Sequence, residues 1–240
     1  IEIAKELNQN LKIAKLYCEQ KRDYIKINYK NSRITPLNPA PNLNVSLIDE
    51  MTHIVALAGA EQIQECLKTG ADIIAIDGGS TDSGPFSLGS GTSKYSRAAI
   101  KAEWKSLMIA REEACIPLII GSCGTCGTDS MVDWMEEITI ELAKELNQNL
   151  KIAKLYCEQQ KDYIKINYKN NRISSLKPAP NLNLSLIDEM THIVALAGAE
   201  QIHECFKTGA EIILAGRTTD TAIIAALPLT RGANPGASWH

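Results

Sequence analysis

The amino-acid sequence predicts an α/β fold, in which helices cover both faces of a mainly parallel sheet in a Rossmann-like, doubly wound arrangement. Short apolar runs such as "ADIIAID" and "IPLII" alternate along the chain with longer amphipathic stretches, as strands alternate with crossover helices. The runs are apolar on both faces, which is typical of strands buried in a parallel sheet. Gly-containing loops follow several of these runs, where strand-to-helix connections are expected.

Residues 1–70 are expected to alternate between helix and strand around one Pro/Asn-rich loop. Gly70 is placed to end the last helix, because glycine readily adopts the left-handed conformation that closes a helix. The expected elements are a helix at 1–9, a strand at 11–18, a helix at 19–31, the loop at 31–44, a short helix after Ser46 and a helix at 60–70.

The middle of the chain is expected to continue in the same way. A strand at 71–77 runs into a loop at 78–93, and Ser93 is placed to cap the long helix that follows. A strand at 116–120 precedes a loop rich in glycine and cysteine and then a helix over about 129–147. The remainder repeats strand, helix, loop, helix and strand, and a last helix opens in "TDTAIIAAL".

The chain contains a long internal repeat. Residues 1–74 recur as residues 140–213 at a constant offset of 139, and 63 of the 74 paired positions are identical. Repeats of solenoid proteins are about 20 to 50 residues long and diverge from one another, so this match has a different origin. A recent duplication, or a join between two closely related sequences, explains it. We favour a chimeric or rearranged fragment over a working tandem protein.

The repeat determines the domain organisation that we expect. Residues 1–76 are a displaced, duplicated α/β segment, and residues 77–240 are the main α/β region, which we expect to be truncated at its C-terminus. Within that region, residues 77–139 are unique and residues 140–240 contain the second copy.

Composition excludes several classes of partner. A net charge of −3 and a pI near 5.9 leave no basic stripe, so neither nucleic acid nor an anionic membrane is an expected partner. No apolar run approaches the roughly 20 residues that a membrane span needs. Seven cysteines without a secretory feature favour reduced thiols and a cytoplasmic location.

The stretch "GSCGTCGTD", directly after the strand at 116–120, contains a C-x-x-C pair. Cys123 lies near a helix start, where a helix dipole can lower the pKa of a thiol and support thiol–disulfide chemistry. A zinc site would need a second ligand pair nearby, and the sequence offers none, so no metal site is expected. Small side chains in a tight loop are the favoured interpretation of Cys123 and Cys126.

The glycines of the same stretch are more informative than its cysteines. A Gly-x-x-Gly-x-x-Gly spacing between a strand and a helix lets the backbone approach a ligand closely and present amides and hydroxyls to an anion. The residues expected to bind such an anion are Gly121, Ser122, Gly124, Thr125 and Gly127. A tight turn with close helix packing is the alternative interpretation.

The loop "DGGSTDSG" is the second candidate cluster. Asp77 ends a strand and Asp82 follows five residues later, with Ser80 and Thr81 between them as candidate substrate-binding residues. Two carboxylates beside anion-binding amides can act as general base and acid, or hold a divalent ion. Turn formation and helix capping are the alternative roles.

The third cluster is "AGRTTD". Arg217 is a fixed cation at a strand end and can bind a carboxylate in a bidentate manner. Asp220 is a candidate catalytic carboxylate or a cap for the last helix. Glu158, which also follows a strand, is a weaker candidate of the same kind. His192 lies beside the apolar "IVALAG", where a packed or surface histidine is expected rather than a catalytic one.

Four segments together resemble the acyclic terpene utilisation (AtuA-like) family: "DIIAIDGGSTDSGPFSLGSG", "IPLIIGSCGTCG", "RISSLKPAPNL" and "AGRTTDTAIIAALPL". The resemblance runs through residues 71–240, in the order of the family's N-terminal region. The family loop usually carries small residues where Cys123 and Cys126 stand here, which disfavours a general role for the thiols. The resemblance implies catabolism of branched acyclic terpenoid acids as acyl-CoA thioesters.

We therefore expect a catabolic enzyme, or a subunit of one, of the lyase or hydratase type. Its substrate would be a small or branched carboxylate or the CoA thioester of one, and Asp77, Asp82 and Asp220 would transfer protons. No separate cofactor is expected, and CoA would enter only as part of the substrate. The alternatives are a non-catalytic binding or scaffold subunit and a thiol–disulfide protein. A homo-oligomer and a partner subunit are both left open.

Overall fold

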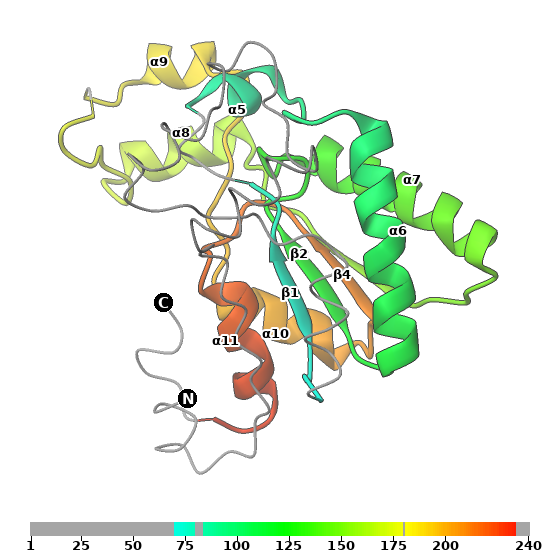
Figure 1. Cartoon of the computed structure of the whole chain (residues 1–240). Coiled ribbons are helices and arrows are strands. Elements are labelled where there is room, and N and C mark those ends of the chain that lie inside the picture. The colour runs from blue at the N-terminus through cyan, green and yellow to red at the C-terminus, as the bar shows by residue number, and fades with distance from the viewer. Residues whose placement is uncertain (1–69, 80–83, 180, 234–240) are drawn as a thin grey trace, which may run out of the picture.

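A computed structural model of the chain describes residues 70–79, 84–179 and 181–233 (Figure 1). The elements expected within residues 1–69 lie outside the described residues. The predicted α/β class is confirmed, because the described part of the chain contains a four-stranded, fully parallel sheet with helices on both faces.

The strands lie in the order β1-β2-β4-β3. Their registers are regular, since Leu118 of β2 pairs with Ile74 of β1 on one side and with Ile212 of β4 on the other. The strands are β1 (Ile74–Asp77), β2 (Leu118–Gly121), β3 (Ile152–Leu155) and β4 (Ile212–Ala215).

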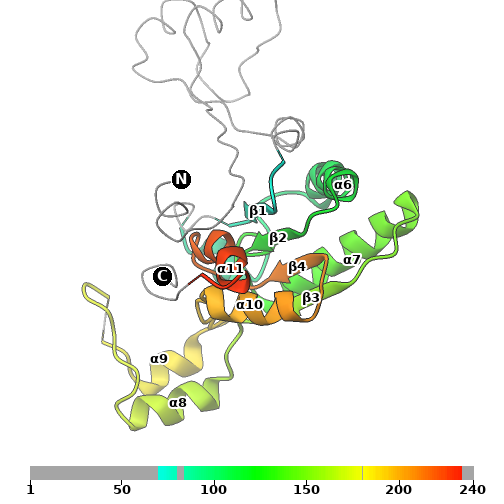
Figure 2. The same cartoon turned by 90° about the horizontal axis from the view of Figure 1, so that it is seen from below.

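Two pairs of helices enclose the sheet, and a third group lies beyond its carboxyl edge. Figure 2 shows α6 and α7 on one face and α10 and α11 on the other. Helices α5, α8 and α9 lie past the carboxyl ends of the strands, and we call these three helices the cap (Figure 1). The helices are α5 (Phe86–Ser90), α6 (Arg97–Ala114), α7 (Asp129–Leu146), α8 (Lys161–Lys169), α9 (Leu184–Glu189), α10 (Ala199–Lys207) and α11 (Ala222–Thr230).

The structure corrects the loop predicted at 78–93. Its second half contains α5, which Gly91 ends in the left-handed conformation with a φ of 65°. The long helix that follows is capped by Ser96, not by Ser93. The Ser96 hydroxyl accepts a hydrogen bond from the amide of Ala99, whereas the Ser93 hydroxyl accepts one from Tyr95 and so stabilises the preceding turn.

Each face of the sheet has its own apolar core. Fully buried side chains such as Met108 and Ile138 pack between the sheet and the α6–α7 pair. Ile202 and Ala226 do the same between the sheet and the α10–α11 pair. No helix in the described parts of the chain is long and apolar enough to cross a membrane.

The topology places a switch point between β2 and β4. The chain leaves β2 for α7 on one face of the sheet and leaves β4 for α11 on the opposite face, although the two strands are neighbours (Figure 2). In open α/β sheets, ligands bind outside the carboxyl ends of the strands at such a point. The loops after β2 and β4 are therefore the place to look for a site.

A buried hydrogen bond links α6 to α7, the two helices on one face of the sheet. The indole Nε1 of Trp104 donates to the hydroxyl of Thr139 at 2.9 Å, and that hydroxyl donates to the carbonyl of Met135 at 2.7 Å. Trp104 and Thr139 are both buried, so neither group has water as a substitute partner.

We expect Thr139→Val to lower the free energy of unfolding by about 1–3 kcal/mol, because a buried indole N–H loses its acceptor. Urea unfolding followed by far-UV circular dichroism measures the change. Thr139→Ser keeps the hydroxyl and should cost less than Thr139→Val. A valine variant as stable as the wild type would show that the hydrogen bond contributes nothing.

Candidate functional site

The loop after β2, which we call the Gly/Cys loop (residues 121–128), folds back onto the end of β4. The amide of Ser122 donates to the carbonyl of Gly216 at 2.8 Å, and the amide of Cys123 donates to Ala215 at 3.0 Å. The loop is buried along its whole length. Backbone hydrogen bonds therefore join the carboxyl ends of the two strands at the switch point into a single edge.

Two glycines of the loop allow this close approach. A methyl group at Gly127 would lie 2.5 Å from the backbone nitrogen of Arg217, and one at Gly121 would collide with the side chain of Thr218. Gly127 also has a φ of 67°, which L side chains rarely adopt. Gly121 and Gly127, both predicted to bind an anion, thus have a packing role in the structure.

The amides of Gly124 and Thr125 have a different environment from those of their neighbours. The Cys126 and Gly127 amides are bonded within the loop, but the Gly124 and Thr125 amides donate no hydrogen bond to any described residue. Both residues are buried and have positive φ values, 60° and 73°. Because a buried amide without a partner costs free energy, this consecutive pair is suited to a ligand anion or an ordered water.

Arg217 follows β4, and its guanidinium reaches the main chain of Thr125. Its Nη1 donates to the carbonyl of Thr125 over a long 3.4 Å, and the half-buried side chain has no carboxylate partner among the described residues. Most of the guanidinium donors are therefore unused by the part of the chain that the structure describes. A planar cation of this kind binds carboxylate or phosphate in a bidentate manner.

Asp77 and Asp220 complete the group. Desolvation raises the pKa of the Asp77 carboxyl above its usual 3.8, a hydrogen bond from the Gly79 amide lowers it, the charge of Asp220 raises it and that of Arg217 lowers it. Burial thus disfavours the charged form of the Asp77 carboxyl. We call Asp77, Gly124, Thr125, Arg217 and Asp220 the carboxyl-edge site.

The other predicted residues fall outside this group. Ser122 is buried and its hydroxyl accepts a hydrogen bond from the amide of Thr218 at 3.4 Å. Ser80, Thr81 and Asp82 lie outside the described residues.

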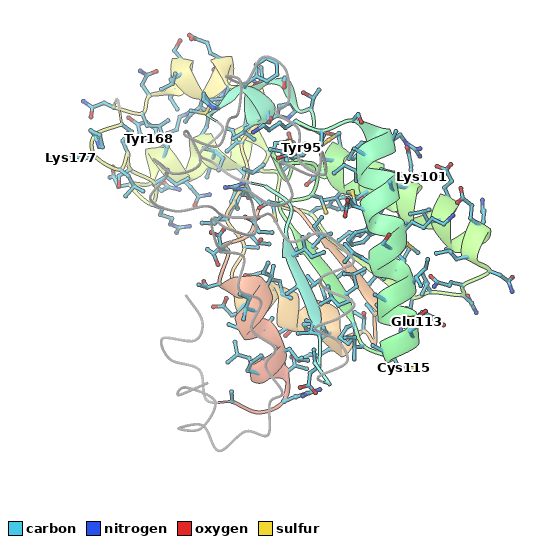
Figure 3. The ribbon with its side chains drawn as sticks, viewed as in Figure 1. Tyr95, Lys101, Glu113, Cys115, Tyr168 and Lys177 are labelled. Carbon is cyan, nitrogen blue, oxygen red and sulfur yellow. The ribbon has the colours of Figure 1, made fainter. Side chains whose placement is uncertain are left out.

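The surroundings of Cys123 and Cys126 do not favour thiol–disulfide chemistry. Cys123 and Cys126 are buried and free, and burial raises the pKa of the Cys123 thiol well above its usual range. A reactive cysteine needs a lowered pKa and access to solvent. The described residues include no cluster of three His, Cys, Asp or Glu side chains able to hold a metal ion. Exposed Cys115 lies at the far end of α6, away from the carboxyl edge (Figure 3).

A second group of polar side chains lies at the end of β3. Glu158 and His192 form a 2.7 Å hydrogen bond there, although sequence reasoning placed Glu158 among the weak candidates and set His192 aside. A cavity of about 550 Å³ opens beside Glu158, between the end of β3 and the cap. Its lining includes Asp129, Glu158, Lys161, Asp188, Thr191 and Ile193.

Comparison with known families agrees with the resemblance seen in the sequence. The model of the acyclic terpene utilisation family protein AtuA matches residues 90–230. The chain belongs to this family. The part that matches the AtuA family contains the Gly/Cys loop, Arg217 and Asp220, whereas Asp77 precedes it. Comparisons with curated proteins and with solved structures gave no significant match.

The raised pKa of Asp77 predicts how stability depends on pH. A carboxyl whose pKa is raised by folding destabilises the folded protein once it ionises, that is, as the pH rises above 3.8. Asp77→Asn, whose side-chain oxygen can still accept from Gly79, should therefore raise the free energy of unfolding at pH 7, and the gain should disappear near pH 3.

Urea unfolding at the two pH values measures this difference. Asp133→Asn is a suitable control, because hydrogen bonds from Tyr156 and Lys154 hold the pKa of Asp133 below its usual value and its replacement should not stabilise. A D77N variant less stable than the wild type at pH 7 would contradict the assignment of Asp77 as an acid disfavoured in its charged form.

Proposed function

We propose that this AtuA-family chain is a catabolic enzyme, or an enzyme subunit, that acts on a small or branched carboxylate or its CoA thioester. The reaction would be of the lyase or hydratase type, in which a proton and a leaving group or water are removed or added. The proposal rests above all on the carboxyl-edge site. Within the described residues, the Arg217 guanidinium there has no carboxylate partner and contacts Thr125, and the buried amides of Gly124 and Thr125 have no acceptor.

The binding half of the site would hold the anionic group of the substrate. Arg217 would donate two parallel hydrogen bonds to a carboxylate, and the amides of Gly124 and Thr125 would donate to a carboxylate or a thioester carbonyl oxygen. The same donors would stabilise negative charge that develops on that oxygen when a neighbouring carbon gains or loses a proton. No separate cofactor is needed for such a step.

The acid–base half would be Asp77, assisted by Asp220. A carboxyl group with a raised pKa keeps its proton closer to neutral pH and can deliver it to a carbon or an oxygen of the substrate. The neighbouring Asp220 charge favours this form of Asp77. Asp82, in the adjacent loop, is retained as a further candidate carboxylate in this proposal.

The second candidate function is a non-catalytic binding or scaffold subunit. It is favoured by the occupied amides of the Gly/Cys loop, because four of its backbone donors serve the fold and not a ligand. Binding of an acyl-CoA without turnover would support this alternative. Turnover by the chain alone would exclude it.

The test uses 3-methylbut-2-enoyl-CoA and isovalerate as probes of the unsaturated thioester and the branched acid. Arg217→Met should weaken binding of either probe about 10- to 100-fold in calorimetry, since a hydrogen bond to a charged group contributes about 1.5–3 kcal/mol. Asp77→Asn should leave binding of the thioester nearly unchanged and lower the rate of hydration about 10²- to 10⁴-fold. Mass spectrometry detects hydration as the gain of one water.

Arg231→Met is the matched control for Arg217→Met. It removes the same charge from an exposed arginine that pairs with Asp72 at 2.8 Å, away from the site, and it should bind both probes as the wild type does. Equal binding by R217M and R231M, or full activity of D77N, would contradict the proposed roles.

A further inference from the structure

Glu158 and His192 are brought together by a short antiparallel pairing of the backbone. Glu158 forms a β-bridge with Val194, the amide of Gln159 donates to Ile193 at 2.7 Å, and the amide of Ala195 donates to the residue before Glu158 at 2.8 Å. The segment that carries His192 is therefore fixed beside the end of β3. These contacts join residues more than 30 positions apart in the sequence.

The Glu158 carboxylate is held at both of its oxygens. Oε1 accepts from His192 Nδ1 at 2.7 Å, and Oε2 accepts from the amide of Asp129, the first residue of α7, at 3.3 Å. The Asp129 carboxylate in turn accepts from the amides of Cys157 and Glu158, both at 3.0 Å. The Glu158 carboxylate thus lies at the N-terminal, positive end of an 18-residue helix.

This arrangement determines the tautomer of His192. An ionised carboxylate can only accept hydrogen bonds, so Nδ1 must carry a proton. In the neutral ring the lone pair is then on Nε2. Nε2 has no hydrogen-bond partner among the described residues, and the histidine side chain is 25% exposed.

Nε2 faces the end of α5. A methyl group at Gly91 would lie 2.6 Å from Nε2, so the absence of a side chain at Gly91 leaves room for this nitrogen. The segment that joins α5 to α6 contacts the Gly/Cys loop, because the amide of Lys94 donates to the Thr125 hydroxyl at 3.2 Å. Thr191 Oγ1 donates to Gly89 at 2.8 Å and fixes the histidine segment against α5.

We propose that His192 is a general base at the carboxyl edge and that Glu158 is its positioning residue. This inference rests on the proposed function and assigns a base to it. Nε2 would take a proton from a water molecule, so that one O–H bond breaks and one N–H bond forms. The oxygen electron pair would form the new C–O bond to an unsaturated acyl thioester or acid while the C=C π bond breaks. The neighbouring carbon would then take a proton from solvent water, and Nε2 would return its proton to solvent, so that one water molecule is added in total. The step needs no oxidant or reductant.

The ligand class is proposed from the polar cavity on the Glu158 side of the pair. Glu158 lines the 550 Å³ cavity together with Thr191 and Ile193, whereas His192 does not line it, and the wall of the cavity is mainly polar. Such a space suits water and a hydroxylated product better than an extended apolar chain. The Glu158 carboxylate would stabilise the imidazolium that forms when Nε2 accepts its proton.

The first experiment tests the geometry without any substrate. ¹⁵N NMR of the histidine rings of the full chain should show neutral His192 as the Nδ1–H tautomer, and Glu158→Ala should remove this preference. His203, whose Nδ1 lies 2.9 Å from the Thr230 hydroxyl, is the internal reference and should not respond. A wild-type His192 protonated on Nε2 in the neutral form would overturn the proposal.

The second experiment tests access to Nε2. Diethylpyrocarbonate should modify His192 in the wild type and much more slowly in Gly91→Ala, whose methyl group covers the nitrogen. Gly232→Ala is the matched control, because Gly232 also has a positive φ, 90°, but an added methyl would meet nothing within 4 Å. Equal modification of His192 in G91A and G232A would show that Gly91 does not guard the nitrogen.

The third experiment tests catalysis with 3-methylbut-2-enoyl-CoA as the probe. His192→Asn keeps a donor toward Glu158 but lacks Nε2, so hydration should fall about 10²- to 10⁴-fold with unchanged KM and thermal stability. Loss of turnover in H192N with full turnover in D77N would support this base and contradict the proposed role of Asp77. Full turnover in H192N with loss of turnover in D77N and R217M would overturn the assignment of His192 as the general base and leave the proposed function unchanged. A wild type that neither binds nor hydrates the probe would overturn both.

Discussion

The backbone hydrogen bonds between the Gly/Cys loop and the end of β4 are the constraint on which the rest of the structure depends. They join two neighbouring strands whose chains then leave for opposite faces of the sheet, and so they fix the loops at the switch point relative to each other. Gly127 is required because the backbone of Arg217 lies against it. Main-chain contacts therefore fix the backbone of Arg217, from which the guanidinium reaches Thr125.

This constraint separates two roles that a glycine-rich loop can have. Most of the loop amides serve the fold, as the bonds of Ser122 and Cys123 to β4 show, and the loop as a whole is buried. The amides of Gly124, Thr125 and Thr128 donate no hydrogen bond within the described residues, and Gly124 and Thr125 are the consecutive pair among them. The cysteines occupy the buried positions on either side of this pair of residues, and the raised pKa of Cys123 is a consequence of that burial rather than a sign of thiol chemistry.

The fold class and the meeting of three loops could be predicted from the sequence, because apolar runs alternating with amphipathic stretches leave few other arrangements. Asp77 and Arg217 were found in this way, since both directly follow strands. Helix α5 could not be predicted, because its sequence "FSLGS" has no clear helical period and its end depends on the left-handed Gly91. The Glu158–His192 pair could not be predicted either. It depends on an antiparallel bridge between loops 36 residues apart, from Glu158 to Val194, and no local pattern records that pairing.

We propose that a carboxylate binds at the carboxyl edge through the amides of Gly124 and Thr125 and through Arg217. Backbone amide chemical shifts of the ¹⁵N-labelled chain during titration with isovalerate test this most directly. The Gly124 and Thr125 signals should move in proportion to occupancy, while those of Ser122 and Cys123, whose amides already donate to β4, should stay nearly constant. Saturable binding that leaves Gly124 and Thr125 unmoved, or that moves only residues remote from Arg217, would contradict the account.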